Sequence, residues 1–250
     1  MTSIAHPDGW SWITRLGEAT LLLPLMVGVC TALWRLPAQR TLVRRWVGAL
    51  LPVTVLTTAS KVAFMGWGLG SARLDYTGIS GHAMFASALL PVLGHLAHRT
   101  WLGPRAAVTG IGTCSGGVLA VLVAVSRVQV GAHSWSEVLL GLGAGAIVSA
   151  WTLVRVPGHA VLPWHRGASA ALAVALPLAM VWAPPSRTHD WVTRLALEAS
   201  GRREPWQRGE LKARTPRPAA RTQPVGDRAP ALRLPQVRSP GPPPTNLRSG

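Results

Sequence analysis

Ser80, Gly81 and His82 stand together in a part of the chain that is otherwise mostly apolar. A Ser-Gly pair at a helix start presents backbone N–H groups and the positive end of the helix dipole, which suits an anion such as phosphate. His82 can exchange a proton with a phosphate ester oxygen. An ordinary N-cap serine beside an interfacial histidine explains the same residues, so this patch alone leaves both interpretations open.

A longer polar motif begins at Ser126-Arg127, reaches His133 after five further residues and Glu137 after three more. His133 and Glu137 share a helix face because they are four residues apart. A carboxylate there can keep one imidazole nitrogen protonated and leave the other as a nucleophile. Ser134 and Glu137 also match a helix capping box, which accounts for neither Arg127 nor His133. We therefore favour a functional interpretation of this motif.

Lys61 is the third candidate, and it is one of only two lysines in a chain with 23 arginines. A lysine near the end of an apolar segment can bind an anion. Its amine can equally extend to the membrane interface with no further role. We weigh the two interpretations evenly.

Long apolar segments must position these groups. Only four acidic residues occur before position 185, namely Asp8, Glu18, Asp75 and Glu137. A soluble domain would alternate apolar and charged faces, whereas a membrane helix needs about 20 apolar residues to cross about 30 Å of hydrocarbon. Blocks of that kind lie near 16–34, 46–67, 83–98, 106–125, 135–154 and 168–184. The sequence therefore predicts an all-α fold, a polytopic membrane bundle of about six transmembrane helices.

Tryptophans and small residues support these segments. An amphipathic indole prefers the membrane interface, and tryptophans fall near the predicted ends at Trp34, Trp46, Trp67, Trp101, Trp135, Trp151, Trp164 and Trp182. Small residues let membrane helices approach closely, and the fourth block has Gly110, Gly112, Ser115, Gly116 and Gly117.

Arginines in the short connections predict the orientation. Eight of them lie on one side, in the connections 35–45, 99–105 and 155–166. The opposite side has three, Arg15, Arg73 and Arg127. The positive-inside rule places the larger set in the cytoplasm, so residues 68–82 and 126–134 face outward. We expect an integral protein of a bacterial-type inner or plasma membrane with its site on the outer side.

The same topology brings the polar patches together. Blocks two and four end, and blocks three and five begin, on this outer side. The groups that can converge there in one pocket are Lys61, Ser80, His82, Arg127 and His133. Because ionisable residues within a membrane are costly, a convergent set of them indicates a functional site.

In this order the patches resemble the type 2 phosphatidic acid phosphatase family of lipid-phosphate phosphatases, which shares its catalytic core with the vanadium haloperoxidases. The resemblance covers roughly residues 55–145 and rests on Lys61, Ser80-Gly81-His82 and Ser126-Arg127-x5-His133-x3-Glu137. It implies that His133 attacks phosphorus to form a phosphohistidine, oriented and charged by Glu137. It implies that His82 protonates the departing oxygen and then assists water. The implied phosphate-binding set, with no metal or cofactor, is Lys61, Ser80, Gly81 and Arg127.

Three positions depart from the family pattern. Gly68 and Leu69 stand where the first motif has Arg-Pro, which makes that motif degenerate. Arg73 is a candidate to replace the missing charge. Ile79 replaces the proline before Ser-Gly-His, and Glu137 replaces an aspartate while keeping the charge. The lost arginine matters most, because each charge that binds a phosphoryl group can contribute several kcal/mol to catalysis.

Two functions from different classes follow. The first is a membrane-bound, metal-independent phosphatase that hydrolyses a phosphomonoester or diphosphate of a lipid, such as phosphatidate or a polyprenyl diphosphate. The second is a catalytically weak or inactive family member that binds lipid phosphates or partner proteins in the membrane. The missing Arg-Pro pair motivates the second.

The end of the chain has a different composition. Residues 199–250 are rich in Pro, Gly and Arg, so they cannot bury enough apolar surface to offset the entropy of ordering. We predict a disordered basic tail there and a helical membrane domain over 1–198. The tail can bind anionic lipid head groups, but a solvated extension is the favoured interpretation, and no specific nucleic-acid partner is expected. The block 168–184 is short and contains two prolines, which leaves the side of the tail open.

Overall fold

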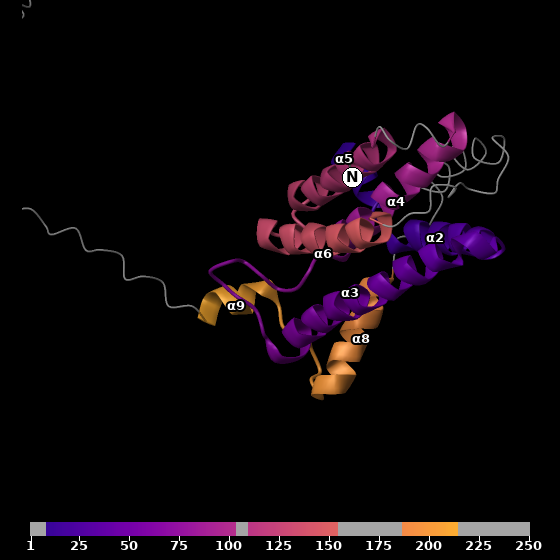
Figure 1. Cartoon of the computed structure of the whole chain (residues 1–250). Coiled ribbons are helices and arrows are strands. Elements are labelled where there is room, and N and C mark those ends of the chain that lie inside the picture. The colour runs from indigo at the N-terminus through magenta and orange to yellow at the C-terminus, as the bar shows by residue number, and fades with distance from the viewer. Residues whose placement is uncertain (1–8, 104–109, 155–186, 215–250) are drawn as a thin grey trace, which may run out of the picture. The chain divides into compact units, whose positions relative to one another are not determined.

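The computed structural model describes residues 9–103, 110–154 and 187–214 of the 250-residue chain. Helices dominate this part (Figure 1), in the order α1 (Gly9–Arg15), α2 (Ala19–Trp34), the 3₁₀ turn η1 (Pro37–Gln39), α3 (Arg40–Trp67), α4 (Gly81–Leu102), α5 (Ile111–Gln129), α6 (Trp135–Leu153), α8 (Thr188–Ser200) and α9 (Arg208–Arg214). In these ranges, extended pairing is limited to one isolated bridge between Ser71 and Tyr76. The predicted all-α fold is confirmed.

Five of the six predicted membrane segments coincide with helices, and the sixth, 168–184, lies outside the described residues. By length and apolar composition, four stretches can cross a membrane: Gly9–Trp34, Pro37–Trp67, Ile111–Gln129 and Trp135–Leu153. α4 falls outside this set because it carries three histidines and Arg99. The described helices are those of a membrane protein.

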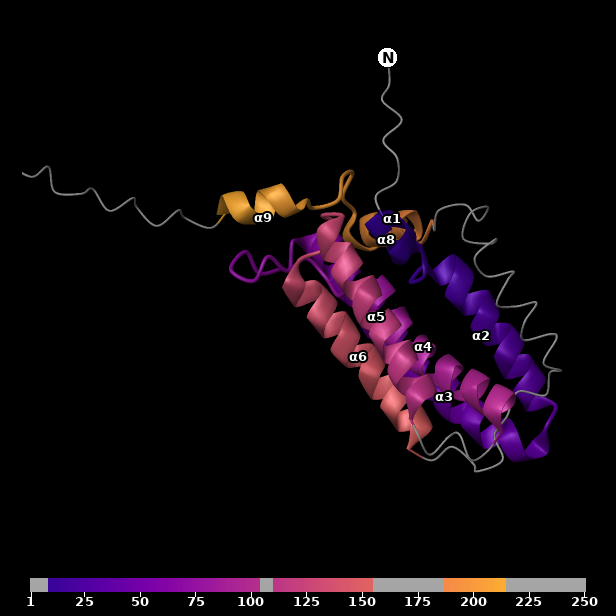
Figure 2. The same ribbon diagram turned by 90° about the horizontal axis from the view of Figure 1, so that it is seen from above.

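α4 is the central helix of the bundle. It packs against α2, α3, α5 and α6, and Figure 2 shows α2, α5 and α6 running beside it. Glycines permit this approach, because a Cβ at Gly94, Gly112 or Gly116 would collide with backbone across the α4–α5 contact. The predicted close approach is confirmed for Gly112 and Gly116, whereas the Cβ position of Gly117 is open. A helix enclosed in this way can carry polar residues that face protein instead of lipid.

Trp46 was predicted at the membrane interface because it lies near a block end, but its side chain is buried in the core. Its side chain is 0% exposed, and its Nε1–H donates to the Ala88 carbonyl at 3.1 Å. The reason is that α3 begins at Arg40, so Trp46 lies more than one turn inside the helix, in the core shared by α2, α3 and α4. The other described tryptophans predicted at interfaces are exposed, namely Trp34, Trp67, Trp101, Trp135 and Trp151.

Large apolar side chains cover the outer faces of the long helices. Exposed examples are Leu51, Val55 and Leu56 on α3, Val118, Leu119, Val121 and Leu122 on α5, and Leu139, Leu140 and Ile147 on α6. So much contiguous apolar surface is unfavourable in water and favourable in lipid. The bundle therefore has a polar end and apolar outer faces, as a membrane domain requires.

The C-terminal part of the described chain differs from the predicted disorder. α8 continues to Ser200, and α9 follows within residues 199–214. α8 packs on α3, where Ala196 is fully buried. Apolar residues at helical spacing give α8 its packing face at Val192 and Ala196, whereas Trp191 and Leu195 are exposed. Residues 215–250 lie outside the described part, and the division of the chain into two domains stays a prediction.

Neighbouring glycines on α5 provide a test of the packing. Gly116→Val should lower the unfolding free energy in detergent by about 1–3 kcal/mol, because the new side chain meets α4 backbone. Gly117→Val is the matched control, since nothing lies within 4 Å of a Cβ there. Thermal unfolding of the two purified variants measures the difference. Equal stability of the two would contradict the described α4–α5 contact.

Candidate active site

A cavity of about 900 Å³ lies at the end of the bundle where α3 and α5 end and α4 and α6 begin. Five of the seven predicted site residues line it, namely Lys61, Gly81, His82, Arg127 and His133. The other two, Ser80 and Glu137, are fully buried next to lining residues. α2, α8 and the segment that enters α9 complete the wall. The structure thus brings all seven predicted residues to one place.

The patch Ser80-Gly81-His82 forms the start of α4. Ser80 is the N-cap residue, but its hydroxyl makes no capping hydrogen bond, so the ordinary capping interpretation does not account for it. Its Oγ is buried and has no hydrogen-bond partner among the described residues. Lys61 Nζ lies 4.0 Å from the position that a Cβ of Gly81 would occupy. A cation therefore faces the N-terminal N–H groups of α4, an arrangement that suits a phosphoryl group.

A tight turn sets the spacing between Arg127 and His133. The backbone N–H groups of Ala132 and His133 both donate to the Arg127 carbonyl at 3.1 Å. Gly131 permits the turn because its φ of +69° is in the left-handed region that glycine adopts readily. α6 therefore begins beside the end of α5, and the side chains of Arg127 and His133 line the same cavity. Arg127 Nε is buried without a partner among the described residues.

His133 and Glu137 are in direct hydrogen-bond contact. His133 Nδ1 lies 2.7 Å from Glu137 Oε2, and the Glu137 side chain is 0% exposed. A carboxylate can only accept, so the imidazole Nδ1 carries the proton. The Nε2 lone pair of His133 is then free of the proton, as a nucleophile requires.

Glu137 also serves the capping role that the sequence left open. Its Oε2 accepts from the Ser134 backbone N–H at 3.1 Å, and the reciprocal capping bond is present too. Its Oε1 accepts from the Thr77 backbone N–H at 2.7 Å and from Thr77 Oγ1 at 2.6 Å. One carboxylate therefore caps α6 and also contacts the His133 imidazole.

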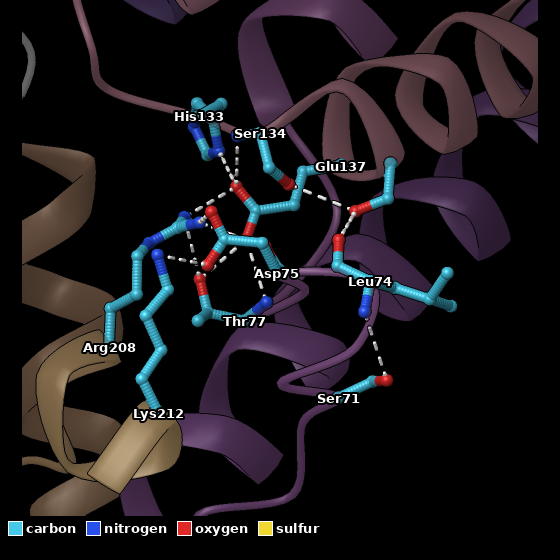
Figure 3. A network of polar contacts seen from close by, with 10 residues as sticks. Ser71, Leu74, Asp75, Thr77, His133, Ser134, Glu137, Arg208 and Lys212 are labelled. Carbon is cyan, nitrogen blue, oxygen red and sulfur yellow. Dashed lines mark hydrogen bonds and ion pairs between the residues drawn. The ribbon is translucent and has the colours of Figure 1, made fainter. Parts of the chain in front are cut away.

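A third group of partners comes from α9 and was not predicted. Arg208 Nη2 lies 2.9 Å from Glu137 Oε1 and 2.8 Å from Oε2, as Figure 3 shows. Arg208 Nη1 pairs with Asp75 Oδ2 at 3.0 Å, and Lys212 Nζ pairs with Asp75 Oδ1 at 3.0 Å. Glu137 is thus enclosed by an imidazole, a guanidinium and backbone N–H groups.

The charges around His133 favour its neutral form. Burial lowers its pKa below the ordinary value of 6.5, and Lys61 and Arg127 lower it further, although the hydrogen bond to Glu137 acts in the opposite direction. The neutral imidazole is therefore the favoured form at neutral pH. In the described part of the chain, no three His, Cys, Asp or Glu side chains are grouped in a way that could hold a metal ion.

Comparison with known proteins identifies the family. A family model described as the PAP2 superfamily matches residues 29–159, about half of the chain. The chain belongs to the PAP2 superfamily. An uncharacterized 22.5 kDa protein of the cps region of Klebsiella pneumoniae is 42% identical over 147 residues, which cover 58% of this chain and 68% of that protein. Phosphatidylglycerophosphatase B of Bacillus subtilis (strain 168) is 27% identical over 147 residues, 54% of this chain and 68% of the relative. No solved structure matches the chain significantly.

The PAP2 match contains every site residue predicted from the sequence, but it ends before α8 and α9. Together with the relative's name, it supports a phosphatase-type function in a membrane protein. Arg73, the candidate for the missing first-motif arginine, is exposed and is absent from the cavity lining. Arg208 is among the residues that line the cavity.

Sequence reasoning missed Arg208 because it lies inside the segment that was assigned to the basic tail. The sequence does contain a signal that this segment is helical. Four of the nine acidic residues fall between positions 190 and 210, where the only proline is Pro205, whereas the chain beyond 215 is dense in Pro and Arg. Acidic residues at intervals along apolar positions indicate an amphipathic helix and not a disordered basic segment.

Titration of His133 tests the electrostatics of this PAP2 site. In protein labelled with ¹⁵N-histidine, the imidazole of His133 should protonate only below pH 6.5, because burial and the nearby cations disfavour its charged form. A difference spectrum against His133→Gln assigns the signal in detergent micelles. A midpoint at or above 6.5 would show that the Glu137 contact outweighs burial.

Proposed function

We propose that this protein is a membrane-bound, metal-independent phosphatase that acts on a phosphomonoester or diphosphate of a lipid. The observation that carries the proposal is the 2.7 Å contact between His133 Nδ1 and Glu137 in a cavity also lined by Lys61, Arg127 and His82. One face of the cavity offers a nucleophile and the surrounding cations offer phosphate ligands. Membership of the PAP2 superfamily supports the same reaction class.

The proposed reaction has two steps. The Nε2 lone pair of His133 forms a bond to phosphorus while the bond from phosphorus to the leaving oxygen breaks, and that oxygen takes a proton from His82. Water then attacks the phosphohistidine and gives a proton back to His82. The N–P bond breaks with its electron pair returning to Nε2, which releases phosphate. Glu137 stabilises the positive imidazole that exists between the two steps.

The phosphoryl group would be held by four groups that converge on the start of α4. These are Lys61, Ser80, the Gly81 N–H and Arg127. The buried Ser80 Oγ and Arg127 Nε support this assignment, because each has no partner among the described residues. A buried polar atom without a partner is costly, and a phosphoryl oxygen would satisfy it.

A lipid chain fits the apolar part of the same cavity. Apolar lining residues from several helices lie beside the polar end, namely Leu23, Phe64, Met65, Phe85, Trp191 and Val192. A substrate with a phosphate and a hydrocarbon chain would match both parts. Phosphatidate-like lipids and polyprenyl diphosphates share this chemistry, and the Bacillus subtilis relative is named for a phosphatidylglycerophosphate.

We propose that the site faces outward from a bacterial-type inner or plasma membrane. The arginines that support this orientation lie at the opposite end of the bundle, around the α2–α3 connection. Arg40 Nε donates to the Trp34 carbonyl at 3.0 Å, and the guanidinium groups of Arg40 and Arg44 lie over the Trp34 ring. Arginines in short connections are typical of the cytoplasmic side, whereas tryptophans are enriched at both interfaces.

A second candidate function is a family member that binds lipid phosphates or partner proteins with little or no turnover. The presence of Gly68 in place of the family's arginine favours it. In that case lipid binding would survive both His82→Ala and His133→Ala, and the parent would release no phosphate.

Phosphate release from a lipid panel tests the proposed function. The panel contains phosphatidate, phosphatidylglycerophosphate and a polyprenyl diphosphate in detergent micelles. His133→Ala should reduce release to background because it removes the nucleophile, and His82→Ala should reduce it by about 10²–10⁴-fold because it removes a general acid. His98→Ala, at the far end of α4, is the control and should retain activity.

A covalent trap separates the phosphohistidine mechanism from other routes. Lipid labelled with ³²P, quenched in alkali, should leave label on the parent protein and none on His133→Ala. Label on neither protein, with continued phosphate release by the parent, would exclude a phosphohistidine. No release from any lipid of the panel, by a folded parent, would exclude the phosphatase itself.

A further inference from the structure

The C-terminal arm, defined here as residues 187–214 with α8 and α9, packs on a run of alternating glycines at the end of α3. A Cβ at Gly66 would lie 3.2 Å from Ser200 Cβ on α8. A Cβ at Gly70 would lie 3.0 Å from Leu211 Cδ2 on α9. The arm therefore approaches both glycines closely, and a larger side chain at Gly66 would press on α8.

The middle glycine of this run is the position where the family pattern has arginine. Gly68 ends α3 with a φ of +69°, and a Cβ there would lie 3.1 Å from the Trp206 ring. Trp206 is fixed by its backbone N–H, which donates to the Met65 carbonyl at 2.9 Å, and by Arg202 stacked over its ring. An arginine at position 68 would have a strained backbone, and its Cβ would press on the Trp206 indole.

Arg208, two residues after Trp206, contacts the buried carboxylate of Glu137. Arg208 Nη2 contacts both oxygens of Glu137, at 2.9 and 2.8 Å, and Thr77 Oγ1 at 3.2 Å. Its Nη1 donates to the Asp75 carbonyl at 2.8 Å and pairs with the Asp75 carboxylate at 3.0 Å. The Asp75 carboxylate in turn holds Lys212, so α9 is attached by two cations.

We propose that Arg208 is a positioning residue of the active site, which holds the Glu137 carboxylate ionised and aimed at His133 Nδ1. This inference rests on the proposed function. It assigns a role to a segment that lies outside the PAP2 match, and it makes the C-terminal arm a part of the catalytic unit. The arm that occupies the space at Gly68 would bring a different arginine to the site.

The physical reason is the burial of Glu137. An ionised carboxylate with 0% exposure is costly unless opposite charge and hydrogen-bond donors surround it. Arg208 supplies the full positive charge while His133 is neutral. Without Arg208, the carboxylate would be stabilised most by a proton on His133, and an imidazolium is no nucleophile.

The charges that face His133 come from every surrounding element. Lys61 on α3, His82 on α4 and Arg127 on α5 line its cavity, and His189 on α8 lines it too. Glu137 on α6 contacts it directly. Arg208 on α9 contacts Glu137 and also pairs with Asp75 in the α3–α4 loop. Removal of Arg208 takes a positive charge away from the Glu137 carboxylate that contacts His133, so the pKa of His133 should rise.

Direct binding of the phosphoryl group by Arg208 is the competing role. Both Nη groups already donate to Glu137, Thr77 and Asp75, which leaves only Nε for a ligand. A phosphate-binding arginine normally offers two parallel N–H groups. The occupied donors therefore favour action through Glu137.

Steady-state kinetics of Arg208→Gln on the lipid that the parent hydrolyses test the proposal. We expect kcat to fall by about 10–100-fold with KM within about threefold, as is usual when a group behind a reacting residue is lost. The acid limb of kcat/KM should move to higher pH, and Arg208→Lys should recover part of kcat. Arg203→Gln, exposed on the same arm, is the control and should match the parent. A raised KM with unchanged kcat, or an unmoved acid limb, would overturn the proposal.

A double-mutant cycle guards against a simple loss of folding. If Arg208 acts through Glu137, Arg208→Gln should lower kcat by less than about threefold in the Glu137→Gln background. The reason is that the two changes remove one interaction. Full additivity would overturn the proposal. If the parent releases no phosphate, the ¹⁵N titration of His133 decides alone, with a higher midpoint in Arg208→Gln expected and an unchanged midpoint contradicting the positioning role.

Discussion

The buried negative charge of Glu137 determines how the chain is arranged at the end of the bundle that holds the candidate site. Glu137 is withdrawn from solvent, so each of its lone pairs must meet a donor or the fold would lose several kcal/mol. Its donors come from the start of α6, from the loop before α4 and from α9. Satisfying one carboxylate therefore fixes three chain segments, and His133 takes its orientation from the same atoms.

The bundle supplies the frame for that charge through backbone proximity. α4 runs through the middle, with glycines on α5 and α6 where a side chain would collide with it. This contact brings the N-terminus of α4, with its unpaired N–H groups, beside the ends of α3 and α5. The same logic recurs outside the bundle, where the glycines near the end of α3 accept the C-terminal arm. Small residues thus decide where the polar groups of the site can meet.

Much of this was predictable from local patterns. Apolar blocks revealed the helices, and residues close in sequence, such as His133 and Glu137, revealed half of the site because helix geometry fixes their distance. Trp46 was misplaced because the block boundary fell inside α3. Arg208 was missed for a deeper reason. Its partner lies 71 residues away, and averaging the composition over 199–250 hid the short amphipathic segment that carries it. Pairing across such a separation has no local signature.

The separation between Glu137 and Arg208 also has a consequence for biosynthesis. A ribosome completes α6 before it reaches α9, so the Glu137 carboxylate exists before its guanidinium partner does. An isolated ionised carboxylate is unfavourable in hydrocarbon, and the protonated acid is the form that inserts at lower free energy. The ion pair with Arg208 can form only once α9 has been synthesised. Among the described residues, the contacts around Glu137 are therefore completed only after α6 and the helices before it have been synthesised.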